Sequence, residues 1–384
     1  MKALLLRADW DPRPGYEVSD WEKRTGKAVT GSSVWRHPRL QVEEVPIPSL
    51  TPDQVLVRVK ACGVCGSDIH FYETDSDGYM LYPGLTKFPA AVGHEFSGIV
   101  ADKGSAVTDL DVGDMVTAEE MIWCGHCTPC RNGYPNQCEN LEEIGFTIHG
   151  AAAEYIAIGA KYCWKINAIA KRLGDEDKAL EMSALTEPIC VAYNGIFECA
   201  GGFRPGQYVA VFGAGPIGLA SIGLARAAGA GKIAAFEVSD RRRDLAQKVG
   251  ADHVYDPRQV KPAEALLELS SGQGFDFFVE AAGAPQHTMP EAETALAIGA
   301  RVVQIGRAAT RVPMYLERLQ VRKAKVFGAQ GHSGYGNFAN VIRLVASGRL
   351  DLSPIITARY PLSRGVEAIQ QATKREDGKI LLRA

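Results

Sequence analysis

The pattern of hydrophobic and polar positions changes near the middle of the chain. Within the first 190 residues, QVLVRVKACGV, EFSGIVADKG and DMVTAEEMIW are short β-branched runs that glycine and aspartate interrupt. Such runs predict the short strands of a β-rich domain. From about residue 192, strand-like and helix-like segments alternate instead. Alternation at this length predicts an α/β domain with a doubly wound parallel sheet.

The alternating segments set the expected domain limits. YVAVFGAG predicts a strand and a turn, and PIGLASIGLARAAGA has apolar residues at helical spacing. KIAAFEV, DRRRDLAQKVGA, HVYD, FDFFVEAAG and ARVVQIG continue as strand, helix and three strands. We expect this domain to span residues 191–331 and to end near KAKVFGAQG. Residues 332–384 are too few for a core of their own, so we expect them to return to the first domain, residues 1–190.

Composition narrows the class of protein. The chain has 384 residues, a net charge of −3 and 46% apolar residues, which fits two globular domains. No basic excess favours nucleic acid or a membrane surface as a partner. The apolar run Ala3–Leu6 is too short for a signal peptide or a membrane span, so we expect a cytoplasmic protein. In a reducing compartment, clustered cysteines bind metal more often than they form disulfides.

A glycine motif follows the strand YVAVF. Gly213, Gly215 and Gly218, with Pro216 and Ile217 between the last two, form GAGPIG. A strand before and a helix after are the context in which G-x-G-x-x-G binds a dinucleotide. The glycines allow a tight turn, close approach of the pyrophosphate and close packing of helix on strand. We therefore expect these five residues to bind the cofactor.

An acidic residue downstream decides which dinucleotide is favoured. Glu237 ends the segment KIAAFE, 19 residues after Gly218. A carboxylate there binds the ribose hydroxyls and repels a 2′-phosphate, so NAD is favoured over NADP. Arg242, with an arginine on either side, could pair with a 2′-phosphate if Glu237 turned away. The simpler interpretation of the three arginines is a solvated helix start.

Four cysteines lie within WCGHCTPCRNGYPNQC. Cys124, Cys127, Cys130 and Cys138 can close a tetrahedral zinc shell with no open position. Such a site cannot bind substrate, so we expect a structural zinc that folds a lobe at residues 119–140. His126 lies within the lobe but is surplus to four thiolates.

A second group of metal-ligand residues is spread along the chain. Cys65 lies in ACGVCGSDIH, His94 and Glu95 in GHEFSG, and Glu187 in LTEPICVAYNG. One thiolate, one imidazole and one carboxylate leave room for an exchangeable water, as in a catalytic zinc site. Such an ion lowers the pKa of a bound hydroxyl, so that hydride can leave to NAD. Cys65 is a better candidate than Cys62, which lies on the strand leading in.

Polar residues near Cys65 suggest a route for the alcohol proton. Ser67 and His70 follow Cys65 by two and five residues. A hydroxyl beside the metal and an imidazole further out could form a proton relay. Asp68 could orient a metal ligand from behind.

These motifs, in this order, resemble the zinc-containing medium-chain dehydrogenases over essentially the whole chain. The resemblance rests on CGVCGSDIH, GHEFSG, the four-cysteine lobe, the Glu187–Pro188 pair, GAGPIG, Glu237 and GADHVYD. It implies a GroES-like catalytic domain whose sequence is interrupted by a Rossmann domain, with two zinc ions per chain and NAD.

Within that family, Glu187 followed by proline resembles the sorbitol, threonine and glucose dehydrogenase branch, where simple alcohol dehydrogenases commonly have cysteine. The branch also has the pair seen at His94–Glu95, so the third zinc ligand stays open between Glu95 and Glu187. The branch implies a secondary hydroxyl of a polyol, cyclitol or sugar as substrate and a homo-oligomer, either tetramer or dimer. The alternatives are a threonine-dehydrogenase-like enzyme and a non-catalytic, zinc-stabilised NAD-binding regulator.

Two segments depart from the usual family pattern. One is an arm at residues 10–38, and the other is an insert at residues 73–87, ETDSDGYMLYPGLTK. Both are similar to a subgroup of the family that acts on oxidised inositols (the scyllo-inosose 3-dehydrogenases). A ring with many hydroxyls needs polar partners, and the candidates are Asp75, Asp77, Tyr79, Glu119 and His332.

Overall fold

A computed structural model describes residues 1–308 and 311–384, which form two compact units. The first unit contains residues 1–187, 358–374 and 379–384, and the second contains residues 188–357 and 375–378. The chain therefore enters the first unit three times. Among the described residues, no helix is long and apolar enough to cross a membrane.

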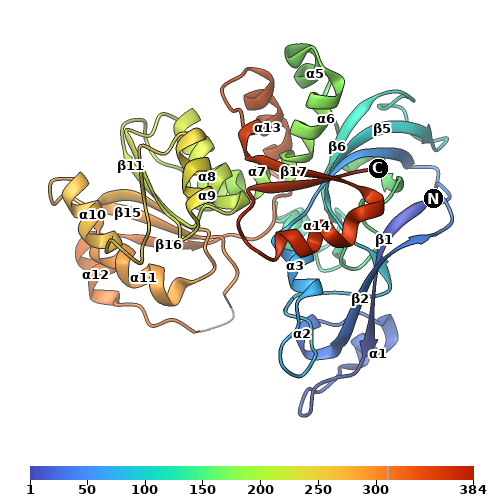
Figure 1. Ribbon diagram of the computed structural model, residues 1–384, viewed down its shortest axis with the longest axis horizontal. Helices are drawn as coiled ribbons and strands as arrows, with labels where there is room; N and C mark the ends of the chain where they lie inside the picture. Colours follow the sequence, from blue (N-terminus) through green and yellow to red (C-terminus); the bar gives the residue numbers. More distant parts are fainter. Residues whose placement is uncertain (309–310) are drawn as a thin grey trace. The chain divides into compact units, whose positions relative to one another are not determined.

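The first unit is mostly β-structure with short helices (Figure 1). Its elements are β1 (Lys2–Trp10), α1 (Asp20–Thr25), α2 (Gly31–Val34), β2 (Trp35–Glu44), β3 (Gln54–Gly63), α3 (Gly66–Tyr72), β4 (Ala90–Ala91), β5 (Glu95–Lys103), β6 (Met115–Ala118), β7 (Met121–Ile122), α4 (Thr128–Arg131), η1 (Pro135–Gln137), β8 (Glu142–Glu143), β9 (Tyr155–Gly159), η2 (Ala160–Tyr162), β10 (Cys163–Lys165), α5 (Asn167–Leu173), α6 (Glu176–Ala184), η5 (Leu362–Arg364), α14 (Gly365–Ala372) and β18 (Lys379–Arg383). Two elements, α7 (Thr186–Tyr193) and β17 (Ile356–Pro361), cross from one unit to the other.

The main sheet of this unit has the order β10-β6-β5-β3-β18-β17, and β9 also pairs with β3. Strand β3 is central because Val55, Val57 and Val59 alternate with more exposed residues and are buried. The last strand, β18, pairs antiparallel with β3, so that Leu382 lies opposite Cys62. The end of the chain therefore lies beside the strand that leads into Cys65.

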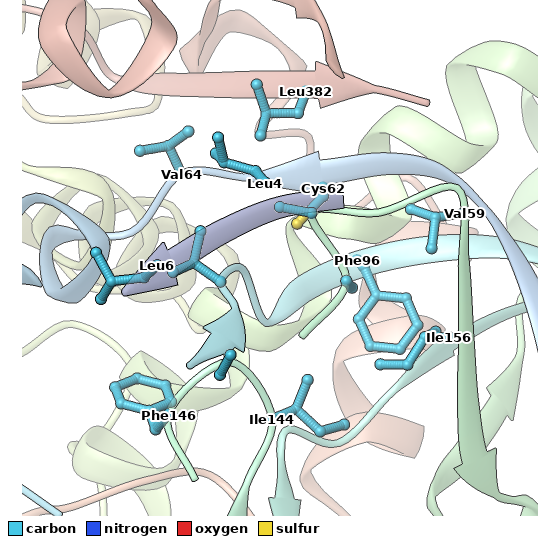
Figure 2. Packing of buried hydrophobic residues seen from close by; sticks show 14 of the residues in the cluster. Leu4, Leu6, Val59, Cys62, Val64, Phe96, Ile144, Phe146, Ile156 and Leu382 are labelled. Carbon is cyan, nitrogen blue, oxygen red and sulfur yellow. The ribbon is translucent and has the colours of Figure 1, made fainter. Parts of the chain in front are cut away.

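The core of the first unit joins residues from distant parts of the sequence. Figure 2 shows one cluster that contains Leu4 and Leu6 of β1, Phe96 of β5, Leu382 of β18, and Phe146, which lies between β8 and β9. All are buried. Burial of apolar area is the main stabilising contribution to such a cluster, so the C-terminal strand is part of the core.

The arm at residues 10–38 is folded. Ser19 caps helix α1 and forms a capping box with Glu22. The carboxylate of Glu22 is buried and also accepts hydrogen bonds from the Tyr16 hydroxyl at 2.8 Å and the Val29 N–H at 2.9 Å. The ring of Trp35 packs edge-on against that of Trp10, with centroids 5.0 Å apart.

The arm and the insert at residues 73–87 bind each other and form one substructure, the arm–insert clasp. Arg13 pairs with Asp75, and its guanidinium lies 4.0 Å from the ring centroid of Tyr79. Backbone hydrogen bonds join the two segments at several points, including a reciprocal pair between Ala28 and Thr86 at 2.8 and 3.0 Å. The sequence separated these segments, and the fold joins them.

The second unit is a parallel sheet with helices on both faces (Figure 1). Its elements are η3, a π-helical turn (Asn194–Cys199), β11 (Tyr208–Phe212), α8 (Pro216–Ala227), β12 (Lys232–Phe236), α9 (Asp240–Lys248), β13 (His253–Tyr255), α10 (Pro262–Leu269), β14 (Phe275–Glu280), α11 (Pro285–Thr294), β15 (Leu296–Gln304), α12 (Leu316–Arg322), β16 (Lys325–Gly328), α13 (Asn337–Ala346) and η4 (Ser353–Ile355). The strand order is β13-β12-β11-β14-β15-β16, with every pair parallel. The order reverses at β11, where ligands of doubly wound sheets bind.

The second unit extends further along the chain than residue 331, the limit that the sequence pattern suggested. It includes α13 and continues to residue 357. Leu350 and Leu352 pack on helix α8, where a Cβ at Gly223 would come within 3.0 and 2.8 Å of their side chains. This apolar contact holds residues 332–357 against the parallel sheet of the second unit. The chain returns to the first unit at residue 358.

Candidate active site

The glycine motif forms the turn between β11 and α8. Gly213 has φ +88°, and a Cβ there would lie 2.8 Å from the backbone of Ala282. A Cβ at Gly218 would lie 1.9 Å from the carbonyl oxygen of Gly213, so helix and strand pack in direct contact. Gly215 caps the helix and Pro216 is its first residue. The N–H groups at the start of a helix favour an anion, so this end of α8 suits the phosphates of a dinucleotide.

Glu237 and Arg242 both lie beside this turn. The carboxylate of Glu237 is buried and accepts hydrogen bonds from the N–H groups of Ala214 at 2.7 Å and Ser239 at 2.9 Å. The guanidinium of Arg242 comes within 3.8 Å of the position a Cβ at Gly215 would take. Burial lowers the pKa of Arg242, and the nearby Glu237 opposes that shift. Arg242 is therefore not merely a solvated residue of a helix start, because it faces the glycine turn.

The four cysteines of the lobe converge as their spacing predicts. The sulfur atoms of Cys124, Cys127, Cys130 and Cys138 all lie within 4.8 Å of one another. The Cys127 and Cys138 sulfurs are 3.8 Å apart, the separation of two ligands about 2.3 Å from one tetrahedral zinc. His126 is exposed and its Nδ1 lies 3.2 Å from the Cys124 carbonyl oxygen, so it is not among the converging groups.

Backbone groups of the lobe point at sulfur, as expected around thiolates. The N–H of Cys127 donates to Cys124 Sγ at 3.4 Å, and those of Cys124 and Asn140 donate to Cys138 Sγ at 3.3 Å. A backbone hydrogen bond from His126 is the main reason that the pKa of Cys124 falls to about 5. Burial raises the pKa of Cys130 to about 12, which a bound cation would reverse.

Glu119 anchors the lobe to the first unit instead of facing a substrate, as the sequence suggested it could. Its carboxylate accepts hydrogen bonds from the indole N–H groups of Trp123 and Trp164, both at 3.1 Å. Lys161 lies 4.5 Å from the centroid of the Trp123 ring. Asp75 and Tyr79 are likewise engaged in the arm–insert clasp, and His332 lies in the second unit with its ring against Phe338.

The open cluster brings together three residues from two segments. Ligand atoms of Cys65, His94 and Glu95 all lie within 4.8 Å of one another. Cys65 immediately precedes α3, and His94 and Glu95 lie where β5 begins. Burial alone would lower the pKa of His94, but the nearby Cys65, Asp68 and Glu187 raise it well above its usual value. These neighbouring groups therefore favour positive charge at His94.

Asp68 supports this cluster from behind. Its buried carboxylate accepts hydrogen bonds from the N–H groups of Cys65 at 2.9 Å and Gly93 at 3.3 Å. It therefore fixes the backbone on both sides of the cluster, next to Cys65 and next to His94. Burial raises the pKa of Asp68, and the positive field of His94 opposes that shift.

Lys379 is a residue of this site that the sequence did not reveal. Its Nζ lies 2.6 and 2.5 Å from the two carboxylate oxygens of Glu95 and 3.0 Å from the carbonyl oxygen of Val64. Both side chains of the ion pair are buried. Burial would lower the pKa of Lys379, but Glu95 raises it overall, so the lysine is charged. No motif marks this residue, and only the pairing of β18 with β3 brings it here.

The predicted relay residues lie next to the cluster. The hydroxyl of Ser67 is buried and makes no hydrogen bond within the described part of the chain. The His70 side chain is 45% exposed, and its Nδ1 is 3.8 Å from a Glu73 carboxylate oxygen. One group therefore lies inside the site and the other reaches solvent.

Glu187 begins helix α7 and is buried. It contributes to the field on His94, although its carboxylate is not in the group formed by Cys65, His94 and Glu95. A carboxylate oxygen of Glu120 lies within 4.8 Å of one from Glu187. Glu120 was not singled out from the sequence, because the adjacent glutamates at positions 119 and 120 form no motif.

Both clusters fit zinc on their own chemistry. The lobe offers four thiols at the right separation. The open cluster offers a thiol, an imidazole and a carboxylate, with a further carboxylate nearby. The Ser67 hydroxyl beside them has no hydrogen-bond partner in the part of the chain that the structure describes. A buried group of this composition needs a cation to balance it.

Comparisons with known proteins agree with this arrangement. Residues 51–168 match the alcohol dehydrogenase GroES-like domain, and residues 216–347 match the zinc-binding dehydrogenase domain. The scyllo-inosose 3-dehydrogenase of Thermotoga maritima is 43% identical over 97% of this chain and 96% of its own. The chain belongs to the zinc-binding alcohol dehydrogenase family. This confirms the GroES-like and Rossmann architecture that the sequence predicted.

Other relatives of this dehydrogenase differ in their named substrates. The L-threonine 3-dehydrogenase of Bacillus velezensis is 34% identical over 89% of this chain and 94% of its own. A solved putative alcohol dehydrogenase from Thermotoga maritima has a TM-score of 0.96 at 42% identity and covers both chains fully. A putative zinc-binding dehydrogenase from Sinorhizobium meliloti, solved with NADP, has a TM-score of 0.80 at 30% identity over 93% of this chain and 99% of its own.

The family settles the class of chemistry. The protein is a dehydrogenase that acts on a CH–OH group and uses zinc and a nicotinamide cofactor. The alternative of a non-catalytic regulator is therefore set aside.

Proposed function

We propose that this dehydrogenase reversibly oxidises a secondary hydroxyl of a cyclitol, polyol or sugar to a ketone, with an inositol-like ring as the first candidate and NAD as the acceptor. This proposal rests mainly on the 43% identity to a scyllo-inosose 3-dehydrogenase over 97% of the chain. A match of that extent includes most of the arm–insert clasp, whereas the threonine dehydrogenase match covers 89%.

We further propose two zinc ions per chain. Cys124, Cys127, Cys130 and Cys138 hold one of them, which is structural. Cys65, His94 and a glutamate hold the other, which when bound polarises the substrate hydroxyl and favours loss of its proton. Glu187 is the better third ligand, since both oxygens of Glu95 already accept hydrogen bonds from Lys379.

The chain's own residues then move the proton. Ser67 has a buried hydroxyl without a hydrogen-bond partner among the described residues, so it is available to accept the hydroxyl proton of the substrate. His70, half exposed, passes the proton to solvent. Asp68 holds the backbone of Cys65 and Gly93 fixed while this happens.

We propose that the enzyme prefers NAD to NADP because of where Glu237 lies. A buried carboxylate bonded to the glycine turn would repel the charge of a 2′-phosphate. Arg242 then faces the pyrophosphate at Gly215 rather than a 2′-phosphate. The relative solved with NADP makes a direct comparison of the two cofactors necessary.

The test is a substrate panel. Purified protein is incubated with NAD and with myo-inositol, inososes, sorbitol, L-threonine and ethanol in turn, and the absorbance of reduced cofactor is followed. The proposal requires the highest kcat/KM on a cyclitol, inosose or polyol. Preference for L-threonine would favour the second candidate, which the 34% match supports, and activity on ethanol alone would contradict both. A higher kcat/KM with NADP would contradict the assignment of Glu237.

A homo-oligomer, tetramer or dimer, is also proposed. In the second unit, strand β16 ends the sheet with an open edge, and Ile298, Leu316 and Val321 expose 74, 70 and 64% of their area. Light scattering of the purified protein tests this, and a monomer would contradict it. A cytoplasmic location is proposed because all nine cysteines are free thiols.

A further inference from the structure

Residues 375–379 join the second unit to the last strand of the first. Residues 375–378 belong to the second unit, and Lys379 begins the final strand of the first. The side chain of Lys379 binds Glu95 of the open metal cluster. Two residues earlier, Asp377 contacts the arginines that follow Glu237.

Asp377 holds Arg242 against the glycine turn. Its carbonyl oxygen accepts a hydrogen bond from Arg242 Nε at 3.0 Å. Its buried carboxylate accepts one from the Thr357 hydroxyl at 2.7 Å and pairs with Arg241 at 3.2 Å. The guanidinium of Arg242 is thereby fixed next to Gly215, where a dinucleotide phosphate would bind.

Gly378 makes this link stiff. A Cβ there would lie 2.5 Å from the carbonyl oxygen of Ile355 and 2.8 Å from a methyl group of Leu245. The backbone is therefore packed closely on the second unit up to the residue before Lys379. A segment so tightly held has no slack, so a displacement of Asp377 is passed on to Lys379 within about 7 Å of chain.

The Lys379 end is equally constrained. The ammonium group has three donors, and Glu95 and Val64 use them all. The side chain is 0% exposed, so no water replaces a lost partner at the protein surface. The position of Glu95 beside Cys65 and His94 depends on where the backbone of Lys379 lies.

We propose that Asp377–Gly378–Lys379 couples dinucleotide binding at the glycine turn to metal binding at Cys65 and His94, with Lys379 as a positioning residue that acts through the neighbouring Glu95. Because the segment has no slack, a ligand that fixes the position of one end also fixes the other, so the second ligand meets a site that is already positioned and binds more tightly. The coupling is reciprocal. This inference rests on the proposed function, because it requires a metal and a nicotinamide cofactor.

The test measures two affinities and no turnover. The open site is emptied while the four-cysteine lobe keeps its zinc, and Co²⁺ is titrated with and without NADH while the thiolate-to-cobalt absorption is followed. NADH is also titrated by fluorescence with and without Co²⁺. In the unmodified protein we expect each ligand to lower the Kd of the other by the same factor, about 5-fold or more.

Lys379→Met should bring that factor to about 1 while NADH still binds to the metal-free protein, and Lys379→Arg should restore part of it. Because Lys379→Met leaves a buried carboxylate unpaired and could impair folding, the double variant Lys379→Met/Glu95→Gln removes both charges together. Arg383→Gln is the matched control. It lies on the same strand, contacts Glu181 instead, and should keep the full coupling.

Two results would overturn the inference: no coupling in the unmodified protein although both ligands bind, or full coupling in Lys379→Met and the double variant. Failure of Co²⁺ or NADH to bind at all would instead count against the proposed function. The two failures are therefore distinguishable.

Discussion

The two clusters of candidate metal ligands in this dehydrogenase have similar side chains but opposite construction. The lobe takes all four sulfurs from residues 124–138, and its own backbone N–H groups stabilise them. The open cluster takes Cys65 and His94 from positions 29 apart, and its support comes from Asp68 and from Lys379 in the last strand. A local cluster can form by itself, whereas an assembled one depends on the whole fold.

Because of this difference, we expect the lobe to contribute to stability and the open cluster to contribute to catalysis. The lobe has four sulfurs and no open position, so a metal there contributes folding energy and nothing else. The open cluster has beside it the Ser67 hydroxyl, which makes no hydrogen bond within residues 1–308 and 311–384, and its charge balance depends on a buried lysine. The predictions below set one cluster against the other.

The largest effect is expected for Cys127→Ser in the lobe. A structural zinc supplies about 10–16 kcal/mol to the folding of a small site, so loss of one ligand should remove that metal and lower Tm by about 10 °C or more. Calorimetry gives Tm, and elemental analysis gives metal per chain, which should fall from two to one. If Tm and metal content were unchanged, the lobe would not be a structural metal site.

Cys65→Ser should do the reverse. We expect kcat/KM to fall at least about 10³-fold, since polarisation of the substrate oxygen contributes several kcal/mol and each 1.36 kcal/mol is a factor of ten. The lobe should keep its metal, and Tm should change little. Loss of both metals together would contradict the independence of the two clusters.

Treatment with a chelator should separate the two clusters by the rate at which each loses its metal. A chelator can attack an ion through an exchangeable position, which the open site has and the closed site lacks. Activity and the first metal should therefore be lost before Tm falls. Samples taken during dialysis, assayed for metal, activity and Tm, check this order, and a simultaneous loss would argue against it.

The smallest effect is expected for Glu119→Ala. This change leaves the indole N–H groups of Trp123 and Trp164 without their acceptor, which costs about 1–3 kcal/mol. Urea denaturation should show that loss while both metals stay bound. Glu139→Ala, an exposed carboxylate of the same lobe, is the control and should leave stability within about 0.5 kcal/mol.

The sequence predicts whatever is built from neighbouring residues. The turn at Gly213–Gly218 and the lobe at residues 124–138 follow from spacing alone, because each is a short segment that folds on itself. Lys379 could not be found in this way, since it reaches Glu95 only through the pairing of β18 with β3. The extent of the second unit beyond residue 331 is hidden from the sequence for a similar reason, since the contact of Leu350 and Leu352 with Gly223 spans more than a hundred residues.

The arm–insert clasp has a consequence for how such enzymes diverge. Arg13 and Asp75, or Ala28 and Thr86, are partners that neither segment can supply alone. Removal of one segment would leave the polar groups of the other without their partners. We therefore expect the two segments to be gained and lost together among relatives. A designer who wishes to move this feature to another dehydrogenase must therefore transplant both segments as a single cassette.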